Sequence, residues 1–177
     1  TLALPPHAGE VALRRGAALS EARVAVIMIH GRNAGPENIL ELASAIDHPD
    51  AIYLAPAAKG GAWYPNSFLA DIDQNEPGIS SGISVIHALI DEIMDAGTPS
   101  ERIVLLGFSQ GACLACTAAQ RRPMRYGGVL AFSGGLIGPP GVRWDAEGSM
   151  QGTPVFLGCS NIDFHIPEKR VRDSAKH

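Results

Sequence analysis

Gly107-Phe108-Ser109-Gln110-Gly111 is the stretch of sequence that decides the fold, and it has the pattern Gly-x-Ser-x-Gly. It follows the apolar run 102–106, which predicts a buried strand, and it precedes the small-residue run 112–120, which predicts a helix. Strand, Gly-x-Ser-x-Gly and helix together are the context of a nucleophile elbow. Such a turn would strain the backbone of Ser109 and lift its hydroxyl out at the carboxyl end of the sheet. The alternative, a chance match, leaves the flanking strand and helix unexplained.

The rest of the chain alternates strands with helices. Expected strands cover 24–29, 51–55, 102–106, 128–134 and 153–159, and expected helices cover 36–46, 79–96, 112–120 and 168–177. Apolar residues recur at helical spacing at Ile39, Leu42, Ala43 and Ile46, and again at Ile79, Ile83, Ile86, Ile90 and Ile93. Residues 1–22 are expected to hold short edge strands, and the long irregular stretch 56–78 is expected to be functional. The alternation predicts a single α/β domain over residues 1–177, with a mostly parallel sheet and helices on both faces.

Composition places the chain among ordinary globular proteins. Its 177 residues are 46% hydrophobic and 18% charged, and the formal net charge is −4. This balance predicts no nucleic-acid partner and no binding to an anionic membrane surface. No stretch is long enough to insert stably in a bilayer, and the amino end does not have the pattern of a signal peptide.

Three cysteines leave two interpretations open. Cys113 and Cys116 form Cys-x-x-Cys in an expected helix, and Cys159 ends an expected strand. The pair could be a redox motif or half a zinc site, but no second ligand pair has metal spacing. Small, buried packing residues are therefore the favoured interpretation, and no metal is expected. An odd number without an evident disulfide framework predicts a reducing compartment, hence a cytoplasmic location.

A nucleophilic serine needs a base, a group that orients the base, and donors for the oxyanion. Asp163 is the candidate orienting acid, because it follows the last expected strand and comes after Ser109 in the chain. A role in capping its own loop is the alternative for Asp163. The expected oxyanion donors are the backbone N–H groups of Gln110 and of Arg32, which lies in the loop after the first buried strand.

Several ordered motifs resemble the phospholipase/carboxylesterase family of small α/β-hydrolases, which includes acyl-protein thioesterases. They run from about residue 22 to residue 177 and comprise Ile29-His30-Gly31-Arg32, Trp63-Tyr64-Pro65, the Gly107–Gly111 stretch, Phe132-Ser133-Gly134-Gly135, Thr153–Cys159 and Asp163-Phe164-His165-Ile166-Pro167. The resemblance implies an α/β-hydrolase fold and cofactor-free hydrolysis of small-molecule carboxylic esters or thioesters. It assigns Ser109 as nucleophile, Asp163 as the acid of the triad, and Arg32 and Gln110 as oxyanion donors.

The resemblance also implies the residues around the substrate. Trp63 and Leu136 would lie near the acyl pocket, and His30 and His165 are candidate pocket residues. Hydrogen bonding of the oxyanion loop is the favoured role of His30. His165 is interpreted as a loop or pocket residue, with an improvised base as the open alternative.

The sequence departs from the family at the catalytic histidine, which in the family follows one more strand. Completing the fold with that strand, a histidine loop and a last helix would take roughly 25–40 more residues. The domain is therefore expected to be incomplete at its carboxyl end. A cleaved or deleted tail, a disordered tail, and a protein that has lost its base remain as explanations.

Three functions follow from these observations. The leading hypothesis is a carboxylesterase that cleaves short- to medium-chain esters through a Ser109 acyl-enzyme. The first alternative is an acyl-protein thioesterase or lysophospholipase with a longer acyl channel. The second is an inactive fragment or binding module, because the histidine is absent. A missing last strand would also expose a sheet edge, which predicts a homodimer or aggregation.

Overall fold

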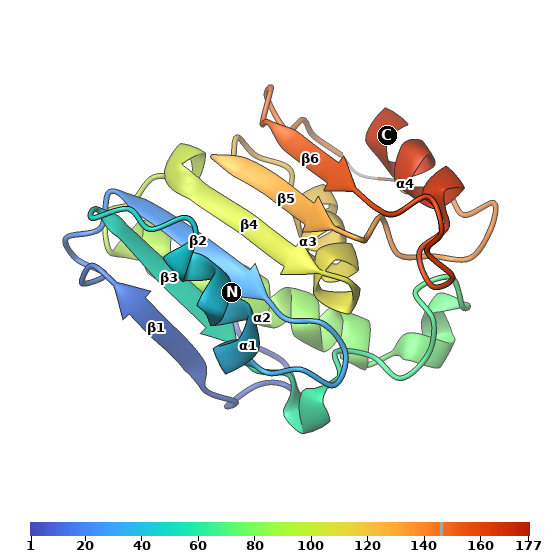
Figure 1. Ribbon diagram of the computed structural model, residues 1–177, viewed down its shortest axis with the longest axis horizontal. Helices are drawn as coiled ribbons and strands as arrows, with labels where there is room; N and C mark the ends of the chain where they lie inside the picture. Colours follow the sequence, from blue (N-terminus) through green and yellow to red (C-terminus); the bar gives the residue numbers. More distant parts are fainter. Residues whose placement is uncertain (146) are drawn as a thin grey trace.

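The computed structural model describes residues 1–145 and 147–177, and its described strands form one mixed sheet. The strand order is β1-β3-β2-β4-β5-β6, with β1 antiparallel to β3 and all other neighbours parallel (Figure 1). The strands are β1 (Ala12–Gly16), β2 (Val24–Ile29), β3 (Ala51–Pro56), β4 (Ile103–Phe108), β5 (Gly128–Phe132) and β6 (Val155–Gly158). The predicted α/β class with a mostly parallel sheet is confirmed.

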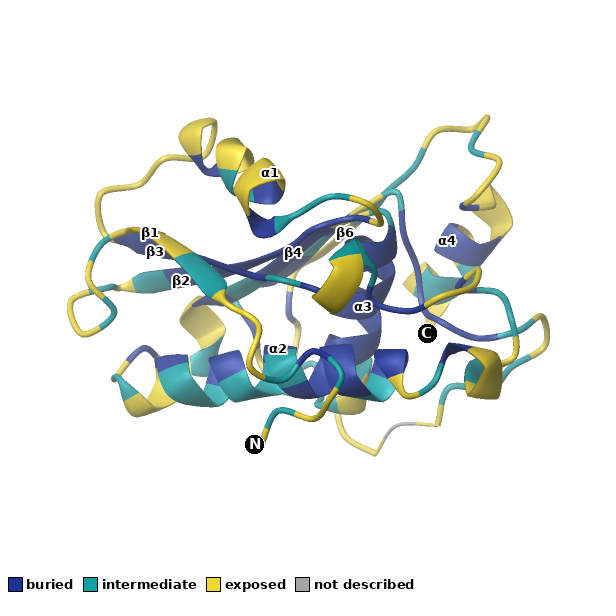
Figure 2. Ribbon diagram, turned by 90° about the horizontal axis from the view of Figure 1, so that it is seen from below, coloured by how far each residue is buried: buried dark blue, intermediate teal, exposed yellow. Residues whose placement is uncertain are grey.

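Helices cover both faces of this sheet. Helices α2 (Gly78–Asp95) and α3 (Gln110–Arg121) lie on one face, and the short helix α1 (Pro36–Leu40) lies on the other (Figure 2). Helix α4 (Glu168–Lys176) follows β6 and lies at the edge of the sheet that β6 forms (Figure 1). Short 3₁₀ segments span Glu41–Ser44, Lys59–Gly61, Ile72–Asn75 and Ser100–Arg102. None of the described helices has both the length and the apolar character that crossing a bilayer requires.

Two hydrophobic clusters sit on the two faces of the sheet. The larger one joins α2 and α3 to alternate residues of β2 and β4, such as Ile27 and Leu105. The smaller one joins the other face of these strands, including Met28 and Leu106, to Ile39 of α1. Side chains of a strand alternate between faces, so a strand buried on both faces reads as a continuous apolar run. The continuous apolar runs of β2, β3 and β4 therefore predict these strands from the sequence.

The structure corrects several predicted boundaries. Helix 36–46 ends at Leu40 and continues as a 3₁₀ turn, which leaves Leu42 and Ile46 about half exposed (44% and 45%). A 3₁₀ turn has about three residues per turn, so residues at α-helical spacing rotate away from the sheet. Strand β5 ends at Phe132 because Ser133 has a positive φ of 57°, and β6 is shorter than predicted. The five isoleucines of α2 are all buried, as their spacing predicts.

Candidate active site

Ser109 occupies the sharp turn between β4 and α3. Its backbone has φ 53° and ψ −116°, a conformation that costs a non-glycine residue about 1–3 kcal/mol. Two hydrogen bonds hold the turn: the Ser109 N–H donates to Phe132 O (2.9 Å), and the Cys113 N–H donates to Ser109 O (3.1 Å). Ser109 itself remains partly exposed. The strain is therefore maintained by the neighbouring strand and by the helix that follows.

The glycines that flank Ser109 are required by close backbone contacts. A Cβ atom at Gly107 would overlap the Gly111 carbonyl, and one at Gly111 would overlap the carbonyls of Ile29 and His30. The turn therefore packs directly on the end of β2 without an intervening side chain. The loop after β2 consequently lies beside the serine.

The loop after β2 approaches the Ser109 turn closely at Gly31. A Cβ at Gly31 would lie 3.5 Å from Ser109 Cβ, which measures how closely the two loops approach. Within the described residues, the N–H groups of Arg32 and Gln110 donate no hydrogen bond. Gln110 opens α3, where a free N–H and the positive end of the helix dipole favour negative charge. The two expected oxyanion donors thus lie in the loop after β2 (Arg32) and at the start of α3 (Gln110), and these two segments meet at the serine.

The Gln110 side chain has a separate structural task. It is buried, its Oε1 accepts from the Trp63 N–H (2.7 Å), and its Nε2 donates to Tyr64 O (2.7 Å). It therefore ties Trp63 and Tyr64, the latter of which lines the adjacent cavity, to the start of α3.

Two buried histidines lie against Trp63, with ring centroids 5.1 Å (His7) and 5.2 Å (His30) from the indole. His30 Nε2 accepts from the Ala58 N–H (3.0 Å), so its proton is on Nδ1, which donates to Gly31 O (2.8 Å). His7 Nδ1 accepts from the Lys59 N–H (3.0 Å), and its Nε2 donates to Trp63 O (2.9 Å). Burial lowers the pKa of both histidines, so both are held neutral.

An open cavity of about 640 Å³ adjoins Ser109. Its lining residues come from the loop after β2, which is expected to supply an oxyanion donor and is called the oxyanion loop below, from the 64–69 segment, the start of α3 and the 164–167 segment: Arg32, Asn33, Tyr64, Pro65, Asn66, Ser67, Phe68, Leu69, Ser109, Gln110, Cys113, Phe164, His165, Ile166 and Pro167. The Arg32 guanidinium donates to Pro65 O (2.8 Å) and Asn66 O (2.7 Å), so it ties the oxyanion loop to one wall. The volume falls within the usual range of small-molecule sites.

Asp163 caps its own turn and lies just outside the cavity lining. Its Oδ1 accepts from the N–H groups of His165 and Ile166, each at 2.9 Å. The loop-capping alternative is thus part of its role, while Oδ2 takes no part in these two bonds. His165 is exposed, and it is the histidine that lines the cavity among the described residues.

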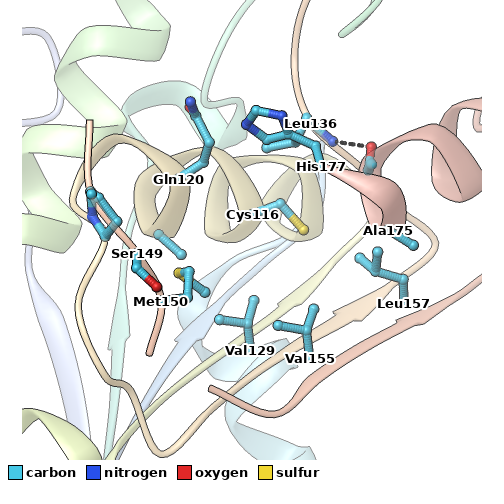
Figure 3. Close-up of a pocket in the computed structure, with 14 residues that line it drawn as sticks. Cys116, Gln120, Val129, Leu136, Ser149, Met150, Val155, Leu157, Ala175 and His177 are labelled. Carbon is cyan, nitrogen blue, oxygen red and sulfur yellow. Dashed lines mark hydrogen bonds between the residues drawn. The ribbon is translucent and has the colours of Figure 1, made fainter. Parts of the chain in front are cut away.

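Three expected pocket residues do not line this cavity. Trp63 is fully buried behind it, and its Nε1 donates to His30 O (2.9 Å). His30 is buried within the oxyanion loop, consistent with the loop role favoured above. Leu136 instead lines a second cavity of about 400 Å³ between α3, β5, β6 and α4, where its N–H donates to Ser174 Oγ (2.9 Å; Figure 3). Trp63 and His30 therefore support the site from behind.

The cysteines are packing residues in this structure. All three are free thiols, and Cys113 and Cys116 are buried on α3. Burial raises the pKa of Cys113 to about 11, which keeps it a thiol near neutral pH although it borders the cavity. No group of three or more His, Cys, Asp or Glu side chains suited to a metal ion occurs among the described residues.

The sequence reasoning missed His7 and Arg170. Residues 1–22 were expected only to form loops and edge strands, yet His7 packs on Trp63. Arg170 was placed in a polar helix, yet it is buried. Neither residue belongs to a motif, and the side chains of both form hydrogen bonds with residues more than 25 positions away. Tertiary contacts of this kind leave no local signal.

The sheet order and the strained serine after β4 define an α/β-hydrolase, and comparison with known proteins specifies the family. The family model described as Phospholipase/Carboxylesterase matches residues 17–176. The solved phospholipase/carboxylesterase from Dyadobacter fermentans is 36% identical, with a TM-score of 0.92 over 98% of this chain and 83% of that chain. The chain belongs to the phospholipase/carboxylesterase family, which is a family of ester hydrolases.

Curated relatives include fungal acyl-protein thioesterases. Acyl-protein thioesterase 1 of Saccharomyces cerevisiae is 30% identical over 176 residues, which cover 88% of this chain and 77% of that protein. Acyl-protein thioesterase 1 of Schizosaccharomyces pombe is 38% identical over 122 residues, which cover 67% of this chain and 54% of that protein. The chain thus matches about half to three quarters of the length of these relatives.

Proposed function

We propose that this chain carries the nucleophile side of a carboxylesterase that cleaves short- to medium-chain esters through an acyl-enzyme on Ser109. The observation that carries the proposal is the strained serine turn, which borders an open cavity and two free N–H groups. Membership of an ester-hydrolase family supports the same chemistry.

In the proposed reaction, Ser109 Oγ attacks the ester carbonyl carbon and its proton passes to a base. The carbonyl oxygen becomes an oxyanion, which the N–H groups of Arg32 and Gln110 stabilise. The C–O bond to the alcohol then breaks, and the alcohol takes the proton from the base. Water repeats the sequence on the acyl-enzyme and releases the carboxylic acid.

Asp163 is proposed as the acid that orients the base. Its Oδ1 is already occupied by the turn, which leaves Oδ2 to accept from a histidine ring. The base itself is proposed to be the histidine that the family carries on a later loop. His165 is the competing candidate, because it lines the same cavity as Ser109.

The lining of the cavity supports an ester with a short- to medium-chain acyl group as the substrate. Phe68, Leu69 and Ile166 give it an apolar side, which suits an acyl chain, and its volume is about 640 Å³. A thioesterase acting on longer acyl chains is the second candidate function, because the curated relatives are acyl-protein thioesterases. Three free cysteines support a reducing, cytoplasmic location for either activity.

The test is covalent labelling with a fluorophosphonate, followed by hydrolysis of p-nitrophenyl esters from acetate to palmitate. Ser109→Ala should abolish labelling and hydrolysis. Ser133→Ala is the matched control, since Ser133 also ends a strand with a positive φ (57°) but does not line the cavity. Unchanged hydrolysis by Ser109→Ala would refute the proposal, and a maximum at palmitate would favour the thioesterase alternative.

A second variant addresses the base. His165→Ala should retain labelling by the full-length protein if the base lies on a later loop. Loss of labelling in His165→Ala, with the fold intact, would assign the base to His165. Absence of any label on Ser109 in the unmodified protein would favour the binding-module alternative.

A further inference from the structure

Arg170 is a buried cation that is solvated by carbonyl groups. The residue is 8% exposed, and it is one of two buried residues of helix α4, the other being Val171. Its Nη1 donates to Leu136 O (3.0 Å) and Gly138 O (2.6 Å), and its Nη2 donates to Pro139 O (3.1 Å). Within the described residues it forms no salt bridge, unlike Arg172 two positions later.

Two aromatic rings complete the surroundings of this guanidinium. Its central carbon lies 5.8 Å from the centroid of Phe68 and 5.1 Å from that of Trp144. Both distances fall within the range of cation–π contact. Trp144 is itself fixed, because its Nε1 donates to Ile137 O (2.9 Å). The guanidinium therefore holds the 136–139 segment through its carbonyls and touches rings from two other segments.

These contacts connect two walls of the cavity beside Ser109. Phe68 forms part of one wall, and its carbonyl accepts from the Gly138 N–H (2.9 Å). Ile166 and Pro167 form part of another wall and lead directly into α4, which carries Arg170. Ser174 Oγ forms a second connection, since it accepts from the Leu136 N–H (2.9 Å; Figure 3) and donates to Arg170 O (2.7 Å).

Stability alone does not account for an arginine at this place. Burying a cation without an acidic partner has a large desolvation cost, and a well-packed apolar side chain often stabilises such a site better. A guanidinium, in contrast, can reach three carbonyls and two rings in one fixed geometry. We propose that Arg170 is a positioning residue, which sets the separation of the Phe68 and Ile166 walls and the place of the Asp163 turn. The inference rests on the proposed esterase function for its kinetic consequence only.

The test compares Arg170→Met and Arg170→Lys with Arg172→Met in the full-length protein. Arg172 lies on the same helix, but it is exposed and pairs with Glu168. The kinetic measurement is kcat and KM for p-nitrophenyl esters of increasing acyl length, at a temperature where circular dichroism shows a folded protein. Arg170→Met should lower kcat and change the ratio between short and long esters by about tenfold, because small misplacements in a site cost this much or more. Arg170→Lys should recover only part of the loss, and Arg172→Met should match the unmodified protein.

A measurement independent of activity separates this inference from the proposed function. Hydrogen exchange of the His165 and Ile166 amides, which donate to Asp163, should be about tenfold faster in Arg170→Met, faster by a smaller factor in Arg170→Lys, and unchanged in Arg172→Met. If the unmodified protein hydrolyses no ester, the proposed function fails, and the exchange result alone decides the positioning role. Unchanged exchange in a folded Arg170 variant overturns the inference. If Arg170→Met does not fold, Arg170→Lys decides: an unchanged ester profile and exchange rate would overturn it.

Discussion

The serine side and the aspartate side of the site are held in different ways. Ser109 directly follows β4, which is paired with a strand on each side, and Leu105 and Leu106 of that strand are buried. Asp163 follows β6, the outermost strand, where Val155 and Phe156 are about half exposed (51% and 49%). Its turn rests on two hydrogen bonds and on the contacts of α4. The proposed nucleophile is therefore fixed by the core, whereas the proposed acid depends on a few contacts at the periphery.

The largest effect is expected from separating the Ser109 turn from the loop after β2, which packs directly on it. Gly111→Ala would place a Cβ on the Ile29 and His30 carbonyls, so we expect a loss of about 3 kcal/mol or more of stability. Denaturant unfolding measures it. Gly128→Ala is the control, because a Cβ there meets only an ordinary contact, 3.5 Å from Pro154 O. Equal stability of the two variants would mean that the loops do not pack as described.

The aspartate side should instead lose activity without losing the fold. Asp163→Asn keeps an oxygen that accepts from His165 and Ile166, and it removes the charge that would orient a histidine. We expect kcat/KM to fall by about a thousandfold or more with little change in unfolding free energy. Asp173→Asn is the control, because it makes the same change on α4 at a partly exposed carboxylate that pairs with Lys169. Near-normal kcat/KM in Asp163→Asn would leave Asp163 with a loop-capping role only.

Acid should lower the free energy of unfolding through the two buried histidines that pack on Trp63 beside the Ser109 turn. Burial lowers the pKa of His30 and His7 below the ordinary value of 6.5, so near that pH the unfolded chain binds more protons than the folded one. Their contribution to stability is complete above pH 6.5 and is lost as the pH falls below it. Thermal unfolding between pH 8 and pH 5 should show this decline. His30→Gln should flatten the curve and the exposed change His48→Gln should not; a curve independent of pH would contradict the neutral assignment.

The difference between the two sides also explains what the sequence could predict. Continuous apolar runs predicted β2, β3 and β4, and the glycines around Ser109 predicted a turn at which backbone passes close to backbone. Both signals are local, because strand burial and glycine requirements depend on neighbouring positions. His7 and Arg170 carried no such signal, since each is defined by partners far along the chain. For the same reason, sequence motifs placed Trp63 near the substrate, although its contacts with His7 and His30 place it behind the cavity.

The smallest effect is expected at the outer edge of the sheet. Strand β6 has one paired side within the described chain, and Phe156 packs on Phe132 with ring centroids 5.5 Å apart. An exposed apolar edge of this kind invites pairing with a second copy.

Phe156→Lys should therefore weaken self-association of this chain by about fivefold, the equivalent of roughly 1 kcal/mol for one cross-strand contact. Sedimentation equilibrium measures it, with Ile46→Lys as a control of similar exposure (45% against 49%) on the loop before β3. A clean monomer at high concentration would rule out the edge as an interface. It would also mean that half-exposed apolar residues on this side coexist with a stable monomer. The smaller number of contacts around the Asp163 turn would then be a property of the single chain, not of an unpaired interface.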